Sequence, residues 1–212
     1  MIPTTLGTLA RQLSELSTLQ NPNIKLEQYQ TDSQTAAKVL WSAFLLGDIK
    51  GKIVADLGCG TGIFGIGSLL LGAKKAYFVE SDPSALEQTK ENLKKVNLTK
   101  KATLGNQDIT SFENTVDTVI QNPPFGTKKE HADKLFLIQA FTHANIVYSM
   151  HKTTTKVFIE AIAKDYKMNI THEWKMEFPI KSTFKFHKKR IERIDVSVWR
   201  FEKEQKKSEK EE

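Results

Sequence analysis

A short apolar run that stops at two prolines places the tightest limit on how this chain can fold. Residues 116–121 read VDTVIQ, and their β-branched apolar side chains are typical of a buried strand. The run is followed by Asn122-Pro123-Pro124-Phe125, and neither proline has an N–H to give to a sheet ladder. The strand must therefore end at Asn122, which leaves the side chain of that residue at an edge of the sheet.

Strand-like and helix-like segments alternate over most of the chain, which is the pattern of a parallel, doubly wound α/β sheet. Strands are expected at 53–57, 76–80, 102–105, 116–121 and 146–150, and helices at 8–19, 34–46, 63–71, 84–96, 132–144 and 153–164. Two later segments, 170–178 and 194–201, alternate apolar with polar residues, which favours an antiparallel pair. We therefore predict a doubly wound, mostly parallel, seven-stranded Rossmann-like α/β sheet with an antiparallel C-terminal edge.

The chain has 212 residues, enough for one domain with a sizeable core. We expect a single domain at 1–201 with an N-terminal helical extension, and a disordered charged tail at 202–212, where every residue is polar. No apolar run approaches the ~20 residues that span a bilayer, and the N-terminus lacks a signal-peptide pattern, so we expect a cytoplasmic protein. The single cysteine, Cys59, excludes an internal disulfide and a cysteine-based zinc site, and we expect no metal.

The strand expected at 53–57 runs directly into Gly58-Cys59-Gly60-Thr61-Gly62 and then into an apolar helix. Alternating glycines let the backbone approach a ligand closely and turn into a helix whose N-terminus faces the site. Glu80 follows the glycines by about twenty residues, the spacing at which a carboxylate takes ribose hydroxyls. The pattern indicates a cofactor that contains a nucleoside.

Asp56 distinguishes between two classes of cofactor. Residues 60–65 also fit G-x-G-x-x-G, the fingerprint of dinucleotide sites, but a carboxylate at the tip of the first strand would repel a pyrophosphate. S-adenosylmethionine has no phosphate, and its ammonium and sulfonium groups favour a nearby carboxylate. Together with Glu80 for the ribose and Asp108 near the adenine, Asp56 favours S-adenosylmethionine over NAD.

The motif at 122–125 suits a planar amine as substrate. The exocyclic amino group of adenine has two N–H donors, and the Asn122 side-chain oxygen and the Pro123 carbonyl are two acceptors on a stiff frame. Phe125 offers a face on which a base can stack. For this motif in isolation, the alternative is a plain exit from the strand, with Phe125 filling the core.

Several motifs together resemble a known family. D-L-G-C-G-T-G at 56–62 with N-P-P-F at 122–125 resembles class I methyltransferases that act on adenine N6. L-E-Q-Y-x-T at 26–31, N-P-P-F-G-T at 122–127 and F-H-K-K at 186–189 narrow the resemblance to the archaeal and eukaryotic methyltransferases of small-subunit rRNA. The resemblance covers Leu9 to Phe201. The family often has proline where this chain has Gln30, a departure that loosens the loop.

The resemblance implies roles for the matching positions. Asn122, Pro123, Pro124 and Phe125 would hold the target base. The residues that would bind the cofactor are Gln28, Thr31, Asp56, Gly58, Gly60, Thr61, Gly62, Ile63, Glu80, Asp108 and Ile109. This places residues 28–31 in the site, although their types alone favour a connecting loop. The eukaryotic members work with a small zinc-binding activator protein, which the resemblance brings in as a potential partner.

A formal net charge of +6 favours a polyanionic partner, and we expect RNA. The expected RNA contacts are Lys128, Lys129, Lys185, Phe186, His187, Lys188, Lys189 and Arg190, with a merely solvated charged loop as the alternative. For His187, a phosphate contact or a merely solvated side chain is favoured over a general base, because a lone histidine is a weak signal. Two other functions stay open: N-methylation of a protein glutamine or a small molecule, and a non-catalytic RNA-binding module with this fold.

Overall fold

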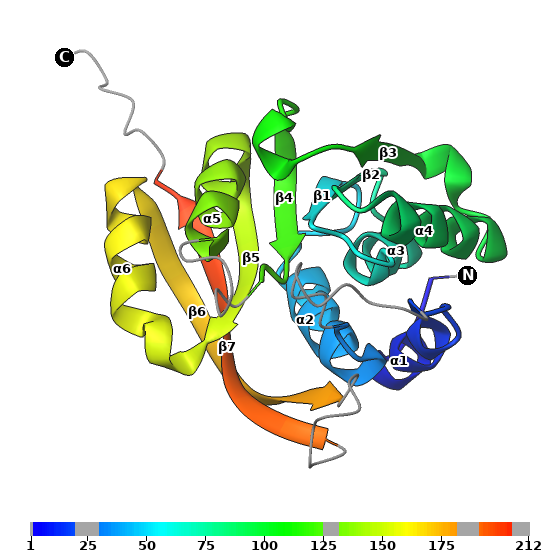
Figure 1. Ribbon diagram of the computed structural model, residues 1–212, viewed down its shortest axis with the longest axis horizontal. Helices are drawn as coiled ribbons and strands as arrows, with labels where there is room; N and C mark the ends of the chain where they lie inside the picture. Colours follow the sequence, from blue (N-terminus) through cyan, green and yellow to red (C-terminus); the bar gives the residue numbers. More distant parts are fainter. Residues whose placement is uncertain (1, 20–29, 125–131, 182–190, 205–212) are drawn as a thin grey trace.

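The computed structural model describes residues 2–19, 30–124, 132–181 and 191–204, and its centre is a seven-stranded sheet (Figure 1). The strands lie in the order β3-β2-β1-β4-β5-β7-β6. Their bounds are Ile53–Leu57 for β1, Lys75–Glu80 for β2, Ala102–Asn106 for β3, Val116–Gln121 for β4, Ala144–Lys152 for β5, Met168–Lys181 for β6 and Ile191–Lys203 for β7.

The first five strands pair in parallel, β7 runs antiparallel to β5, and β6 runs antiparallel to β7. The predicted fold class is therefore confirmed. β1 and β4 have the predicted bounds, whereas β5, β6 and β7 are longer than predicted. Because β7 continues to Lys203, the start of the tail expected at 202–212 was wrong: its first two residues pair in the sheet. Residues 205–212 lie outside the described residues.

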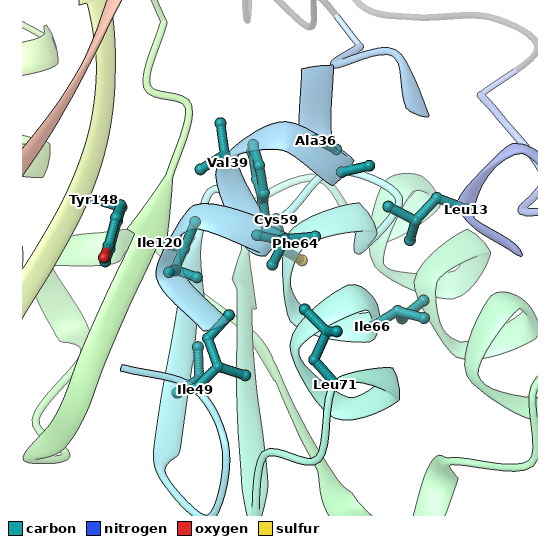
Figure 2. Close-up of a cluster of buried hydrophobic side chains, with 14 of the residues drawn as sticks. Leu13, Ala36, Val39, Ile49, Cys59, Phe64, Ile66, Leu71, Ile120 and Tyr148 are labelled. Carbon is teal, nitrogen blue, oxygen red and sulfur yellow. The ribbon is translucent and has the colours of Figure 1, made fainter. Parts of the chain in front are cut away.

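Helices cover both faces of the sheet (Figure 1). The layer on one face consists of α1 (Leu6–Ser14), α2 (Ser33–Leu45), α3 (Ile63–Leu70) and α4 (Pro83–Lys95), and the other layer of α5 (Ala132–His143) and α6 (Lys156–Asp165). Figure 2 shows Leu13, Val39, Ile66 and Ile120 in the apolar cluster beneath the first layer. None of the helices in the described part of the chain combines the length and apolar character of a membrane span.

The helix at the N-terminus differs from the prediction at both ends, since α1 starts two residues earlier and already ends at Ser14. Thr5 caps the helix by accepting a hydrogen bond from the Thr8 N–H at 3.1 Å. Beyond the helix, Asn92 of α4 holds the chain: its Oδ1 accepts from the Ser17 N–H at 2.8 Å, and its Nδ2 donates to Ser17 O at 2.9 Å. These tertiary bonds replace further helical turns, which the leucine spacing could not indicate.

Two glycines let α3 lie close to its neighbours. A Cβ at Gly65 would overlap the ring of Phe78 in β2, and a Cβ at Gly67 would overlap Leu40 of α2. Side chains at these positions would push α3 away from the sheet and from α2. The glycines therefore set the distance between the N-terminus of α3 and the ends of the strands.

A buried ion pair joins the C-terminal hairpin to the loop before β1. The Asp48 carboxylate accepts from Arg200 Nε at 2.8 Å and Nη2 at 3.2 Å, and from the Tyr148 hydroxyl at 2.6 Å. The side chains of Asp48 and Arg200 are 9% and 8% exposed, so salt screens the pair little. Thr118 Oγ1 donates to Asp48 O at 2.7 Å, which attaches β4 to the same cluster.

We expect Asp48→Ala to lower the free energy of unfolding by about 3–5 kcal/mol, because the buried guanidinium of Arg200 would lose its only buried counter-ion among the described residues. Urea denaturation measures the change. Glu202→Ala is the control: Glu202 also accepts from Arg200, at 2.8 Å, but its side chain is 45% exposed, so its loss should cost no more than about 1 kcal/mol. Equal losses of stability in the two variants would contradict the role of Asp48 as the main counter-ion of Arg200.

Candidate active site

The loops that follow β1, β2 and β4 meet at the carboxyl edge of the sheet. β1 lies between the other two strands, with Leu57 paired to Val79 on one side and to Gln121 on the other. Ligands of open α/β sheets bind outside this edge, where the strand order reverses. The order reverses here between β1 and β4, so the loop after β1 and the Asn122 motif border the same region.

The backbone N–H groups of the glycine loop, residues 58–62, connect it to β2 by hydrogen bonds. The N–H groups of Gly58 and Cys59 donate to Val79 O at 2.9 and 3.0 Å, and the Gly60 N–H donates to Glu80 Oε2 at 2.9 Å. Gly60 has a φ of +55°, and a Cβ there would meet no heavy atom of the described chain within 4 Å. The loop therefore presents open backbone at Gly60, on which a ligand can lie.

Two polar residues of α4 support the glycine loop, and the sequence reasoning missed both. Thr89 Oγ1 donates to Gly60 O at 2.8 Å, and Asn92 Nδ2 donates to Thr61 O at 3.0 Å. Both side chains are buried. The sequence did contain a signal for them. Thr89 and Asn92 follow Leu86 at intervals of three, so two polar residues occupy the face of α4 that should be apolar.

Asp56 and Glu80 bring two buried carboxylates to the strand ends. Asp56 Oδ2 accepts from the Gly65 N–H at 2.8 Å and so caps α3, while Glu80 Oε1 accepts from the Asp82 N–H at 3.0 Å. In the described ranges, no lysine, arginine or histidine lies within 4.0 Å of either carboxylate. The two acids suit a ligand that carries positive charge.

The Asp56 carboxyl group is set to titrate near neutral pH. Burial raises its pKa to about 7 and the charge of Glu80 adds to the rise, while the N–H groups of Gly65 and Phe64 lower it. The sequence favoured a cofactor contact for Asp56 over a helix cap or a solvated turn, and the structure shows that its carboxylate accepts from an N–H in the first turn of α3. Its contact with the cofactor stays a prediction.

Asn122 follows β4 directly, and the segment before α2 holds its amide. Asn122 Nδ2 donates to Thr31 Oγ1 at 3.0 Å, and the adjacent Gln30 donates from Nε2 to Thr61 Oγ1, also at 3.0 Å. Residues 30 and 31 therefore join the target-base motif to the glycine loop. Gln30, the departure from the resembled family, makes one of the two contacts, which the sequence reasoning did not foresee.

The oxygen of the Asn122 amide finds no partner among the described residues. Asn122 Oδ1 is buried and accepts no hydrogen bond within the described ranges. An unpaired buried acceptor costs about 1–3 kcal/mol, and folded proteins leave few of them. Its position at the carboxyl edge indicates an acceptor that is kept for a donor on a ligand. Pro123 beside it is buried and Pro124 half-buried.

Behind Asn122, a chain of buried polar groups reaches α5. Gln121 Nε2 donates to Ser149 Oγ at 3.1 Å, and Ser149 Oγ lies 2.7 Å from His151 Nε2. His151 Nδ1 lies 4.0 Å from Asp133 Oδ2, but burial lowers the pKa of His151 to about 3, so the ring is neutral and this contact is no ion pair. Ser149 is fully buried, so this group fixes the strand end rather than supplying a nucleophile.

The remaining predicted site residues fall into two groups. Ile63 opens α3, and Asp108 lies exposed after β3, where it accepts from the Thr110 N–H at 2.9 Å beside the buried Ile109. Outside the described residues lie Gln28, Phe125, Lys128, Lys129, Lys185, Phe186, His187, Lys188, Lys189 and Arg190. The predicted roles of both groups stay predictions.

The family model of the methyltransferase small domain matches residues 29–164, which include the glycine loop and Asn122. The chain belongs to this family and is a methyltransferase, so S-adenosylmethionine is the expected cofactor. The residues present fit it. Gly60 leaves open space along the loop, and Asp56 and Glu80 are carboxylates for which a sulfonium or an ammonium is a suitable partner.

Named relatives narrow the family further. The chain is 35% identical to the rRNA N(6)-adenosine-methyltransferase Mettl5 of Drosophila melanogaster, over 93% of this chain and 96% of that protein. It is also 35% identical to the rRNA N(6)-adenosine-methyltransferase METTL5 of Danio rerio, over 89% and 94% of the two chains. The chain is thus a homologue of these methyltransferases.

Solved structures agree with the fold. The Pyrococcus horikoshii protein PH1948 has a TM-score of 0.89 and 42% identity, over 95% of this chain and 98% of that chain. The magnesium protoporphyrin IX methyltransferase of Synechocystis, solved with bound S-adenosylmethionine, has a TM-score of 0.64 and 15% identity, over 92% and 90%. At so low an identity the second likeness shows the fold alone.

We expect Gly60→Ala to fold but to bind S-adenosylmethionine at least about tenfold more weakly, because the methyl group would project into the open space along the loop. The backbone strain at positive φ should cost about 1–2 kcal/mol. Gly47→Ala is the matched control, since Gly47 has a φ of +81°, equally open surroundings and a place after α2. Calorimetry should show normal cofactor affinity for Gly47→Ala. An equal loss of affinity in both variants would contradict the placement of the cofactor against Gly60.

A second prediction concerns Asp56 and pH. The folded protein keeps a proton on Asp56 that the unfolded chain releases near pH 3.9, so the stabilising contribution is complete below about pH 4 and is lost as pH rises through about 7. Asp56→Asn keeps an acceptor for Gly65 without the charge. Urea denaturation should therefore show stability falling more between about pH 5 and 8 in the natural protein than in Asp56→Asn.

The same titration should appear in cofactor binding. A cationic ligand favours the ionised carboxylate, so affinity should rise severalfold between about pH 6 and 7.5 in the natural protein. The Asp56→Asn variant should bind more weakly and without this rise. A variant with natural affinity at both pH values would rule out a contact between Asp56 and the cofactor.

Proposed function

We propose that the chain transfers a methyl group from S-adenosylmethionine to the N6 amine of an adenosine in RNA, and that this RNA is small-subunit ribosomal RNA. The observation that carries the proposal is the buried, unpaired Asn122 Oδ1 at the carboxyl edge, next to the glycine loop. The names of the METTL5 relatives support adenosine in rRNA as the substrate.

The protein groups act by aligning the amine. When bound, the cofactor supplies a methyl group on a sulfonium. Asn122 Oδ1 and the Pro123 carbonyl would accept the two N–H groups of the adenine amine and favour a more nucleophilic nitrogen. Asn122 Nδ2 donates a hydrogen bond to Thr31 Oγ1, and this bond would keep the amide oxygen turned toward the substrate. No strong base is needed before attack, since the methylated ammonium product is acidic.

The position of Asn122 also favours unpaired adenosines as targets. A base within a helix must be unstacked before its amine can reach Asn122, so a loop or single-stranded adenosine is the expected target. Phe125 is proposed as the stacking surface, and Lys128, Lys129 and the basic stretch at 185–190 as phosphate contacts. A zinc-binding activator protein remains part of the proposal; methylation by the purified chain alone would show that it is dispensable.

We expect Asn122→Ala to slow single-turnover methylation of RNA about a hundredfold or more, because one aligned transition-state contact is worth ~3 kcal/mol. Stability should change by less than about 1 kcal/mol, since the variant loses the bond to Thr31 but also an unpaired buried acceptor. Nucleoside mass spectrometry gives the product, and thermal melting gives the stability. A stable Asn122→Ala protein with full activity would refute the assignment.

Thr31 provides the matched comparison. Thr31→Val removes the hydroxyl that holds Asn122 Nδ2 at nearly constant shape, and Thr31→Ser restores it. We expect the valine variant to lose rate and the serine variant to recover it. A glutamine peptide assayed beside the RNA separates the alternative substrate class: methyl transfer to the peptide and none to the RNA would replace adenosine with glutamine.

A further inference from the structure

A lysine stands immediately before each of three neighbouring strands. Lys52 precedes β1, Lys74 precedes β2 and Lys101 precedes β3, and all three are exposed. We call these residues the lysine row. The three strands are parallel neighbours in the sheet, so the row lies at their amino ends, on the edge opposite the glycine loop.

Strand register brings these lysines together. Ile53 of β1 pairs with Lys75 of β2, and the Lys74 N–H donates to Lys52 O at 2.8 Å, so the first two members of the row are direct neighbours. The third is close, because Ala76 of β2 pairs with Ala102 at the start of β3, which places Lys101 beside Lys75, one residue along from Lys74. With strands about 4.8 Å apart, the row extends over roughly 10 Å of the edge.

Within the part of the chain that the structure describes, no carboxylate compensates the positive charge of the row. No carboxylate in the described ranges lies within 4.0 Å of any of the three ammonium groups. Of the acids before or at the start of β1 and β4, Asp48 is engaged by Arg200 and Asp117 accepts from the Ile53 N–H at 2.7 Å. The third, Glu113, is exposed before β4, and within the described ranges it lies more than 4.0 Å from every lysine of the row. Like charges on adjacent strands repel one another, and a polyanion would remove that repulsion.

We propose that the lysine row binds the phosphate backbone of the substrate RNA, as a second contact away from the target adenosine; this rests on the proposed function. A strand of five or six residues separates the two edges by about 17–20 Å. A target loop of about three nucleotides, bound at Asn122 by its adenosine, falls short of that distance, whereas a hairpin stem of roughly six base pairs, at about 3.4 Å each, reaches it. The row therefore makes the enzyme prefer folded RNA over the bare target sequence.

The test compares two triple variants. Replacing Lys52, Lys74 and Lys101 with alanine removes the row, and the control removes the same charge through Lys90→Ala, Lys94→Ala and Lys164→Ala. In the control set, Lys90 and Lys94 already pair with Glu87 and Glu91 on α4. Affinity for a hairpin and for its isolated loop is measured without cofactor over a range of salt concentrations, and methylation of the isolated loop is measured in parallel.

The row variant should bind the hairpin about tenfold or more weakly at low salt, with a salt slope smaller by about two to three. Its affinity for the isolated loop and its rate on that loop should not change, and arginine at the three positions should restore hairpin binding. Hairpin binding equal to that of the control variant overturns the proposal, and so does an equal loss for the loop and the hairpin.

These outcomes also separate the proposal from the proposed function. If the natural protein methylates no RNA but the row variant still loses hairpin affinity, adenosine methylation fails and the row stands. If the natural protein methylates the loop while both triple variants bind the hairpin alike, the row fails and the methylation stands. Absence of RNA binding by the natural protein overturns both.

Discussion

The parallel pairing of β1 with β2 on one side and β4 on the other is the constraint on which the site depends. Parallel strands end at the same edge, so the glycine loop, Glu80 and Asn122 come together although they lie far apart in the sequence. A shift of one residue in either register would turn Asp56 or Asn122 to the opposite face of the sheet. Specific contacts hold that register between β1 and β4: Asp117 Oδ2 accepts from the Ile53 N–H, and Thr118 Oγ1 donates to Asp48 O.

The two edges of the sheet carry opposite charge. Among the residues that the structure describes, the two carboxylates at the carboxyl edge have no cationic partner within 4.0 Å, and the lysine row at the amino edge has no carboxylate partner. Each arrangement works against folding stability, Asp56 through desolvation and the lysines through repulsion. Charges that weaken a fold are expected where a ligand of opposite charge binds, which is the common reason for both assignments.

Long-range hydrogen bonds position the parts that backbone pairing does not reach. Asn92 connects α4 both to the chain after α1 and to the glycine loop, and Thr31 holds the amide of Asn122 across 91 positions of sequence. Asp48 and Arg200 join the antiparallel hairpin to the start of β1. Because these polar groups are buried, each one destabilises the fold unless its hydrogen bond forms. The bonds therefore permit one relative position of the joined elements, the position in which all of them form together.

The sequence by itself determined the strands and the ligand loops, because these follow from local rules. Two prolines end a strand wherever they occur, alternating glycines demand a turn with positive φ, and hydrophobic periodicity separates helix from strand. Only the tertiary structure decided where α1 ends, that Asp56 caps α3, and that Asn122 keeps one half of its amide free. Those outcomes depend on which distant side chain meets which backbone group, and that is set by packing between elements rather than by any neighbour along the chain.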